Sequence, residues 1–302
     1  MQLAILLEVT AEKPGNVNVA SSFEGTTFHH FLASSVAAGS SFEEAAYRGD
    51  KVALDELDIG KVGLGKLIRT CASDVNDWQH GGNTILGTIM LFMPIAVAAG
   101  MTPAQKDQKL DLSILRKNID SAVRCTSPLD SVNLYEAVNI ANPSGLNDAP
   151  DLDVTDSRSK ERLLKENVTL FEVFRIASAY DDVCAEWVNS YRVTFDLAYP
   201  FLMEQLKSRS LKEAIVNTFL KILSERADTF IARKVGRTKA QEVSKEAKAV
   251  LDLGGLDTAA GRKRLKQFDQ NLRAEENKCN PGTTADLTAA ALAICTLSGY
   301  RP

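Results

Sequence analysis

Signatures of helix N-termini recur from one end of the chain to the other, and they restrict its fold more than any other feature. Residues 41–44, 210–213 and 238–241 all have the S/T-x-x-E/Q spacing, in which two side chains cap the first backbone amides of a helix. Ser127 followed by Pro128 is typical of an N-cap before a proline at the first helical position. Between these starts, apolar residues follow a helical spacing, and alternating strand patterns are nearly absent. The sequence therefore predicts an all-α fold.

The length of 302 residues allows one large domain or two small ones. The expected helices are joined mostly by short loops, and no repeat or low-complexity tract separates them. We therefore expect a single compact domain of about a dozen helices over residues 1–302. The longest apolar run, residues 84–99, contains Pro94 and is shorter than the roughly 20 residues of a membrane span. It is interpreted as a buried core helix, and no membrane partner is expected.

The composition excludes several kinds of partner and site. A net charge of −4 argues against nucleic acid, whose binding normally requires a basic excess. The five cysteines are widely spaced without a CxxC pair, which disfavours a zinc site and favours reduced thiols in a cytoplasmic protein. The GxxxxGK[ST] and GxGxxG nucleotide motifs do not occur. We predict no nucleic-acid partner and no tightly bound organic cofactor, and the sequence assigns no metal ligands.

A polar turn directly follows the first expected helix, residues 2–9. Pro14 and Gly15 favour a tight turn, beside which Lys13 and Asn16 are candidates to face a ligand. An exposed helix C-cap explains the same residues. Glu8 lies within the apolar run of the helix, so it belongs either to the solvent face or to a cleft.

A glycine-containing turn also precedes the most hydrophobic expected helix. Asn83 and Thr84 follow two glycines there, and Gly87 follows them. Free amides and the positive end of the dipole at a helix N-terminus suit a phosphate group. Ordinary N-capping by Asn83 or Thr84 is an equally good explanation.

The same arrangement occurs before the last expected helix. Asn280 and Gly282 form the turn, and Thr283 or Thr284 is the expected cap. Asp286 is expected in the first turn, beside an otherwise apolar stretch. A carboxylate in the first turn stabilises the helix dipole by ~0.3–1 kcal/mol, so Asp286 needs no catalytic role to be explained.

Basic residues cluster in segment 226–239, where Asp228 is the single acid. Arg233 and Lys234 belong to this cluster. Arginine offers paired donors and lysine a point charge, so the cluster is a candidate polyphosphate clamp, with a solvated helix face as the alternative. Together with the polar turns, it indicates a helical enzyme for an anionic, phosphorylated small molecule.

These motifs, in this order, resemble the triphosphoribosyl-dephospho-CoA synthase family. The resemblance implies an all-α cytoplasmic enzyme that joins ATP to 3′-dephospho-CoA with loss of adenine. Its small-molecule partners would be ATP and dephospho-CoA or a related compound, and a homo-oligomer is compatible with the sequence. The matching pieces span nearly the whole chain: Glu8…Lys13-Pro-Gly15, Asn83-Thr84…Gly87, Asn142-Pro143…Gly145, Asp181, Ile231-Ala-Arg-Lys234…Gly236 and Pro281-Gly-Thr-Thr-Ala-Asp-Leu287.

The resemblance also implies roles for single residues. Departure of adenine from the ribose requires a carboxylate near the sugar carbon, a base for the attacking hydroxyl group, and cations on the triphosphate. Asp181, Asp286 and Glu8 are the catalytic candidates. Mg²⁺ is expected to arrive with ATP. The candidates for binding the substrates are Lys13, Gly15, Asn16, Asn83, Thr84, Gly87, Asp228, Arg233, Lys234, Asn280, Gly282, Thr283 and Thr284.

The chain departs from the lyase-associated members of this family at two places. Residues 23–28 lack the histidine and aspartate of a Gly-x-His-x-Asp-Met stretch, and Ile85 and Leu86 replace a His-Lys pair. The chain is therefore similar to a divergent branch of the kind found in methanogens and methylotrophs, and its acceptor could be a precursor of a one-carbon cofactor. Two other functions stay open: a nucleotide N-glycosidase or phosphohydrolase that uses the same site, and a non-catalytic helical protein that only binds a nucleotide or another protein.

Overall fold

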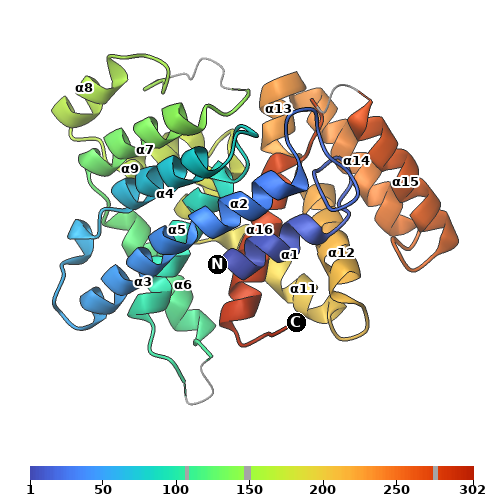
Figure 1. The fold of residues 1–302 in the computed structure, drawn as a ribbon, viewed down its shortest axis with the longest axis horizontal. Coiled ribbons are helices and arrows are strands. Elements are labelled where there is room, and N and C mark those ends of the chain that lie inside the picture. Colours follow the sequence, from blue (N-terminus) through green and yellow to red (C-terminus); the bar gives the residue numbers. More distant parts are fainter. Residues whose placement is uncertain (106–108, 146–150, 275–277) are drawn as a thin grey trace.

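The computed structural model describes residues 1–105, 109–145, 151–274 and 278–302. This part of the chain is built of helices and loops, and apart from isolated β-bridges it contains no strand, so the all-α prediction is confirmed (Figure 1). A 3₁₀-helix, η1, covers Ile59–Lys61, and a π-helix, η2, covers Val193–Ala198. The α-helices are α1 Gln2–Thr10, α2 Phe28–Ala37, α3 Gly39–Ala53, α4 Leu64–Trp78, α5 Leu86–Met101, α6 Leu112–Arg124, α7 Pro128–Ala141, α8 Ser159–Lys165, α9 Leu170–Ala177, α10 Asp182–Val188, α11 Tyr199–Gln205, α12 Leu211–Glu225, α13 Thr229–Val235, α14 Arg237–Asp252, α15 Ala259–Arg273 and α16 Gly282–Leu297.

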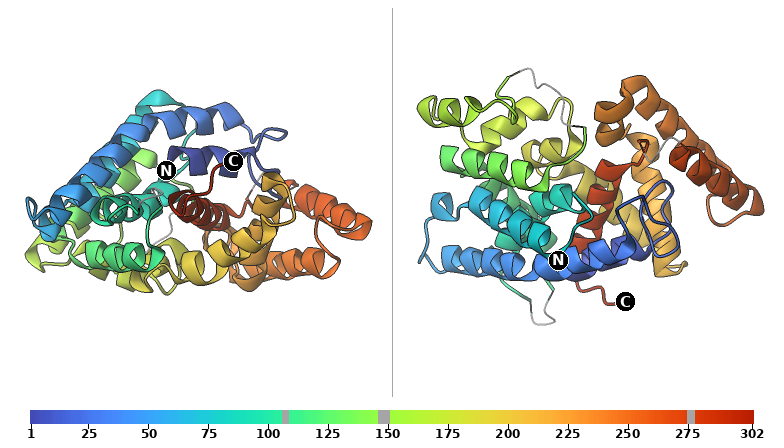
Figure 2. Two further views of the ribbon diagram at one scale, coloured as in Figure 1. Left: turned by 90° about the horizontal axis from the view of Figure 1, so that it is seen from below. Right: turned by 45° about the horizontal axis from the view of Figure 1, so that its top comes forward.

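Helices α5 and α16 lie side by side at the centre of the molecule, and other helices surround them (Figures 1 and 2). Every residue of segments 88–98 and 287–295 is buried. Helices α3, α4 and α6 pack on α5, whereas α1, α11 and α12 pack on α16. The prediction of a buried helix within residues 84–99 is therefore confirmed. No helix in the described ranges is long and apolar enough to cross a membrane.

Pro94 removes one hydrogen bond from the middle of α5 without ending the helix. Proline has no N–H group, so the carbonyl oxygen of Met90 loses its usual helical donor. The indole N–H of Trp187, in α10, donates to this oxygen over 3.0 Å. Trp187 is fully buried and packs edge-on against Phe174 of α9. Helices α5 and α10 are thereby joined inside the core.

Two of the predicted helix starts are confirmed. Ser127 and Ser210 are the N-caps of α7 and α12, and each forms a capping box with the acid three residues later, Asp130 and Glu213. Pro128 occupies the first position of α7, as expected. Both helix starts depend on contacts within a stretch of four residues, so they can be recognised from the sequence alone.

The other two predicted starts are wrong. Helix α3 already begins at Gly39, so Ser41 lies inside it. A Cβ atom at position 39 would lie 2.5 Å from Nε2 of Gln2, so α1 packs closely against this start of α3, which no side chain caps. Helix α14 begins at Arg237 rather than after Thr238, because the chain turns at Gly236 with a positive φ of 99°.

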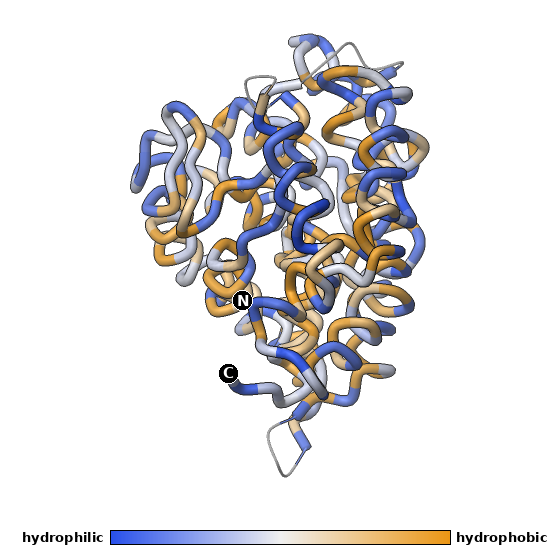
Figure 3. Tube along the Cα trace, turned by 90° about the vertical axis from the view of Figure 1, so that its right-hand side faces the viewer, coloured by the Kyte–Doolittle hydropathy of each residue, from blue (hydrophilic) through white to orange (hydrophobic). Residues whose placement is uncertain are grey.

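Helices α14 and α15 form the edge of the molecule farthest from α3 and α8 (Figure 1). Figure 3 looks at this edge and shows mostly hydrophilic residues along α15. Helix α13 lies between this edge and the central helices, and packs on both α14 and α16. It brings the basic cluster of the sequence next to the core.

Candidate active site

A cavity of about 850 Å³ opens between the central helices and the loops that follow α7. Helices α5, α7, α9, α10, α13 and α16 contribute to its wall, together with residues 81–85, 142–145 and 151–154. This volume is within the range of sites that hold a nucleotide-sized ligand, about 300–1,000 Å³.

Most of the residues predicted from the sequence meet at this cavity, although they come from distant parts of the chain. The predicted residues that line it are Glu8, Asn16, Asn83, Thr84, Gly87, Asp181, Arg233, Lys234, Asn280, Gly282, Thr283 and Asp286. The structure places Lys13, Gly15, Asp228 and Thr284 behind this surface, where they contact protein groups.

Asp286 is a carboxylate of the cavity wall with a strongly shifted pKa. It follows the first turn of α16 instead of lying in it, so the helix dipole does not explain it. The hydroxyl group of Thr88 donates to its Oδ1 over 2.5 Å. Burial raises the pKa of Asp286 to about 8; the hydrogen bond from Thr88 opposes this rise, and the charges of Glu8, Asp228 and Asp181 add to it.

Gly87 makes room for this carboxylate. A Cβ atom at position 87 would lie 2.1 Å from Oδ2 of Asp286, closer than any real contact. Helix α5 therefore approaches α16 at a residue without a side chain, and the next residue, Thr88, supplies the hydrogen bond. The glycine that the sequence marked as a ligand group shapes the site around Asp286.

Asp181 and Arg233 form an ion pair on the same side of the cavity. Asp181 is the N-cap of α10, where its Oδ1 accepts from the amides of Val183 and Cys184. Its Oδ2 accepts from Nη1 of Arg233 over 2.5 Å. The carboxylate thus holds the guanidinium group in one orientation at the cavity wall.

Lys234 lies beside Arg233 on α13. Its Nζ donates to Oδ1 of Asn280 over 3.3 Å and sits 4.9 Å from the ring centroid of Phe230. A Cβ atom on Gly145 would touch its stem at 2.8 Å, so Gly145 allows the loop after α7 to pass close to the lysine. The two adjacent cations therefore belong to one wall, built from α10, α13 and the turn before α16.

Glu8 and Lys13 form a buried pair with a distance of 3.0 Å between Oε1 and Nζ. Lys13 also donates to the carbonyl oxygens of Glu8 and Ala11. Burial raises the pKa of Glu8 and lowers the pKa of Lys13, and the attraction between the two charges opposes both shifts. Lys13 does not face the cavity as expected, because it neutralises Glu8 from behind.

Asp228 joins α13 to α16 and does not line the cavity. Its Oδ1 caps α13 by accepting from the amides of Phe230 and Ile231. Its Oδ2 accepts from both the amide and the hydroxyl group of Thr284, each over 2.7 Å. The expectation that Thr283 or Thr284 caps α16 is wrong, because the helix begins at Gly282 after Pro281, and Thr284 is bound by a carboxylate from another helix.

Gly15 has a supporting role as well. Its amide donates to Oδ1 of Asp269, in α15, over 2.8 Å. The residue has a φ of +71°, and a Cβ atom there would overlap the side chain of Leu272 at 2.8 Å. The turn after α1 is therefore fitted against α15, and Asn16 is the part of it that reaches the cavity.

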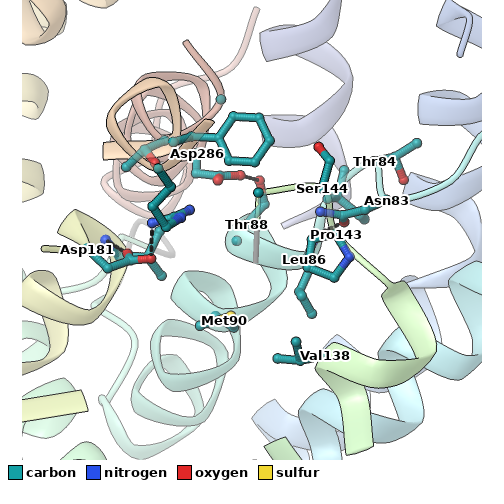
Figure 4. Close-up of a pocket in the computed structure, with 18 of the residues that line it drawn as sticks. Asn83, Thr84, Leu86, Thr88, Met90, Val138, Pro143, Ser144, Asp181 and Asp286 are labelled. Atoms are coloured by element: carbon teal, nitrogen blue, oxygen red, sulfur yellow. Dashed lines mark hydrogen bonds and ion pairs between the residues drawn. The ribbon is translucent and has the colours of Figure 1, made fainter. Parts of the chain in front are cut away.

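The opposite side of the cavity carries amide and hydroxyl groups. Figure 4 shows Asn83, Thr84 and Ser144 on one side and Asp181 and Asp286 on the other. Oδ1 of Asn83 accepts from the amide of Leu86, where α5 begins, and the hydroxyl group of Thr84 shares a 2.7 Å hydrogen bond with Ser34. The expectation that Asn83 or Thr84 is the N-cap is wrong, because Ile85 occupies that position, and Asn83 binds the first helical amide from outside the helix.

Three further residues line the cavity that were not predicted from the sequence: Thr88, Ser144 and Phe230. Thr88 is the one polar residue within 85–99, and this isolated hydroxyl group was an available signal. Ser144 and Phe230 had none, since a serine in a loop and a phenylalanine in a helix are ordinary. The described residues contain no group of three His, Cys, Asp or Glu side chains that could hold a metal ion.

Comparisons with known proteins agree with this picture. A segment of 83 residues is 39% identical to a protein of Pseudomonas fluorescens strain Pf-5 named 2-(5″-triphosphoribosyl)-3′-dephosphocoenzyme-A synthase. A segment of 100 residues is 35% identical to a protein of the same name from Pseudomonas savastanoi pv. phaseolicola. The matched segments span only 28% and 34% of these relatives, and 28% and 33% of this chain.

A crystal structure described as a triphosphoribosyl-dephospho-CoA synthase of Archaeoglobus fulgidus has the same fold. It matches with a TM-score of 0.69 at 22% identity, over 91% of this chain and 100% of the other. The model of the family described as ATP:dephospho-CoA triphosphoribosyl transferase matches residues 1–302. Since that match covers the whole sequence, the chain belongs to the ATP:dephospho-CoA triphosphoribosyl transferase family.

Proposed function

We propose that this protein transfers the triphosphoribosyl part of ATP to a hydroxyl group of 3′-dephospho-CoA or a related cofactor precursor and releases adenine. The family description supports this reaction. The observation that carries the proposal is the composition of one cavity wall, where the paired cations Arg233 and Lys234 accompany the carboxylates Asp181 and Asp286. The reaction needs both kinds of group, cations for a triphosphate and a carboxylate for the sugar and the proton.

The triphosphate would bind beside α13. Arg233 is already oriented by Asp181, so little side-chain entropy is lost when it binds a phosphate. The first residues of α16, Gly282 and Thr283, line the same part of the cavity and add the positive end of a helix dipole. We expect Mg²⁺ to enter with the triphosphate, because Mg²⁺ is commonly bound through substrate phosphates and one or two carboxylates.

The bond between C1′ of the ribose and the adenine nitrogen breaks, and its electron pair leaves with adenine. The acceptor oxygen forms a bond to C1′, and its proton passes to Asp286. Until it takes up this proton, the carboxylate of Asp286 stabilises the positive charge that develops on the sugar. The leaving adenine takes up the proton that Asp286 accepted, directly or through water, so the carboxylate is ionised again.

Asp286 suits the role of base better than Asp181 does. Asp181 is occupied by Arg233 and by the amides of α10, whereas the Asp286 side chain accepts from Thr88. A pKa of about 8 lies close to neutral pH, where a group both accepts and releases a proton efficiently. We place the reaction in the cytoplasm, with no tightly bound organic cofactor.

The test is to incubate the protein with ATP and Mg²⁺, with and without 3′-dephospho-CoA, and to measure free adenine by chromatography. We expect adenine only when the acceptor is present, together with a product heavier by one triphosphoribosyl unit. Adenine in both samples would instead indicate hydrolysis of the glycosidic bond. Absence of adenine from both would exclude dephospho-CoA as the acceptor.

A further inference from the structure

The floor of the cavity differs in chemistry from the wall that carries Asp286. Helices α5, α7 and α9 supply the apolar side chains of Leu86, Met90, Val138, Val173 and Ile176, which we call the apolar floor. In Figure 4, the side chains of Leu86, Met90 and Val138 lie below the polar side chains and away from the carboxylates of Asp181 and Asp286. Val138, Val173 and Ile176 keep part of their surface exposed, so this region is open to a ligand.

No positive side chain accompanies this floor. Among the described residues that line the cavity, Arg233 and Lys234 are the only cations, and both belong to α13. The sequence of the undescribed residues 146–150 contains no Lys or Arg. The carboxylates of Asp151 and Asp153, by contrast, also line the cavity, beside Leu152. A phosphate group on the floor would lose its hydration without gaining a counter-charge, which is strongly unfavourable.

The floor nevertheless offers hydrogen bonds to an uncharged ligand. Tyr180 follows α9 and is 38% exposed, and Ser144 lies on the loop after α7. Tyr135 does not compete for this role, because its hydroxyl group donates to the carbonyl oxygen of Leu152. Apolar side chains with a few hydroxyl groups suit a ligand built of methyl, methylene and amide groups.

The size of the cavity limits what it can enclose. A volume of about 850 Å³ is typical of a site for one ligand of moderate size. Two complete nucleotides would crowd it, and five phosphate groups would compete for two side-chain cations. The acceptor must therefore place an uncharged part on the floor and keep its phosphates near α13.

We infer that the apolar floor is the acceptor subsite and that it binds the uncharged pantetheine arm of a dephospho-CoA-like acceptor. This inference rests on the proposed function for the identity of the acceptor. The diphosphate of the acceptor lies at the α13 wall beside the triphosphate of ATP, and the arm extends past Tyr180 toward Ile176 and Val138. The arm is selected by apolar contact, and a charged group in its place is rejected.

The experiment places either a negative or a positive charge at one position of the apolar floor. Ile176 is 36% exposed, so the variants Ile176→Asp and Ile176→Lys should fold. Ile114, in α6, is 40% exposed and lies outside the cavity, which makes Ile114→Asp and Ile114→Lys matched controls. All measurements use the full chain. Calorimetry gives the Kd of pantetheine, of 4′-phosphopantetheine and of ATP with Mg²⁺, and enzyme kinetics give the KM of dephospho-CoA.

We expect wild-type protein to bind pantetheine, and both Ile176 variants to weaken this binding about tenfold or more, because either charge must be desolvated against an uncharged chain. The Kd of ATP should stay near the wild-type value in both Ile176 variants. Both Ile114 controls should bind pantetheine and ATP as the wild type does. Tighter binding of 4′-phosphopantetheine by Ile176→Lys would show that the floor holds an anion, and would overturn the inference. So would equal binding by all variants, or no binding of pantetheine to wild-type protein at millimolar concentration.

The outcome separates this inference from the proposed function. If adenine is released with dephospho-CoA but the KM is unchanged in both Ile176 variants, the function stands and the subsite is wrong. If pantetheine binds and both charges weaken it while no adenine is released, the subsite stands and the reaction is wrong.

Discussion

Asp228 and Asp286 are two buried carboxylates at the same end of α16, and their surroundings differ. Asp228 accepts hydrogen bonds from three backbone amides and one hydroxyl group, all of which belong to α13 or α16. Asp286 accepts from Thr88, and its side chain lines the cavity. Burial raises the pKa of both groups. Burial alone therefore does not distinguish the two carboxylates; the groups that already bind them do, because Asp228 is held by protein donors and Asp286 lies at the cavity surface.

The largest effect is expected for Asp286→Asn, which leaves the shape of the side chain but removes the base. Activity should fall by about 10²–10⁴, the usual contribution of a general base. The measurement is adenine release at saturating ATP and acceptor. Asp252→Asn, an exposed change on α14, is the control and should keep full activity.

The same variant should not be less stable than the wild type at alkaline pH. The folded pKa of Asp286, about 8, lies above the unfolded value of about 3.9, so the folded state holds the proton more tightly. The contribution of this group to stability is full below pH ~4 and is lost as the pH rises to about 8. When the pH is raised from 6 to 9, the free energy of unfolding, measured with urea, should fall less for Asp286→Asn than for the wild type. An equal loss in both proteins would contradict the shifted pKa.

The next effect is expected for Asp228→Ala, which should destabilise the fold. Removing the carboxylate leaves two amides of α13 and two donors of Thr284 without an acceptor, and we expect a loss of about 3–5 kcal/mol. Thermal and urea unfolding measure it. At temperatures where the variant is folded, its kcat should fall far less than that of Asp286→Asn. A variant that unfolds like the wild type would remove the distinction between the two carboxylates.

The smallest effect is expected for Thr88→Val, which keeps the shape of the side chain and removes the hydrogen bond to Asp286. That bond lowers the pKa of Asp286, so its loss should raise the pKa further, by up to about one unit. Since the base works in its ionised form, the acidic limb of the profile of kcat/KM against pH should move to higher pH. A profile between pH 6 and pH 10 tests this. An unshifted limb at reduced activity would mean that Thr88 only packs.

The parts of the fold that were predictable from the sequence depend on neighbouring residues. The capping boxes at Ser127 and Ser210 are complete within four positions, and the structure contains both. The boundaries at Gly39 and Gly236 could not be predicted in this way. At the first, no side chain caps the helix, and the second depends on a backbone conformation that no local hydrogen bond reveals.

The candidate site shows the same division. Its motifs contained Glu8, Asp181 and Asp286, but they also contained Lys13 and Asp228, and all five are polar residues in or beside apolar helices. The position of each side chain, on the cavity or behind it, is determined by partners far away in sequence. Thr284 binds Asp228 across 56 residues, and Thr88 binds Asp286 across 198.

The link between Pro94 and Trp187 has a consequence for movement within the protein. The carbonyl group that proline leaves without a helical donor accepts from an indole N–H on another helix, so this hydrogen bond opposes sliding of the two helices along each other. Gly87 and Thr88 lie near the start of one of these helices, and Asp181 caps the other. We therefore expect the spacing of these residues to change little, and any opening that admits a ligand to come from the loops and from α13.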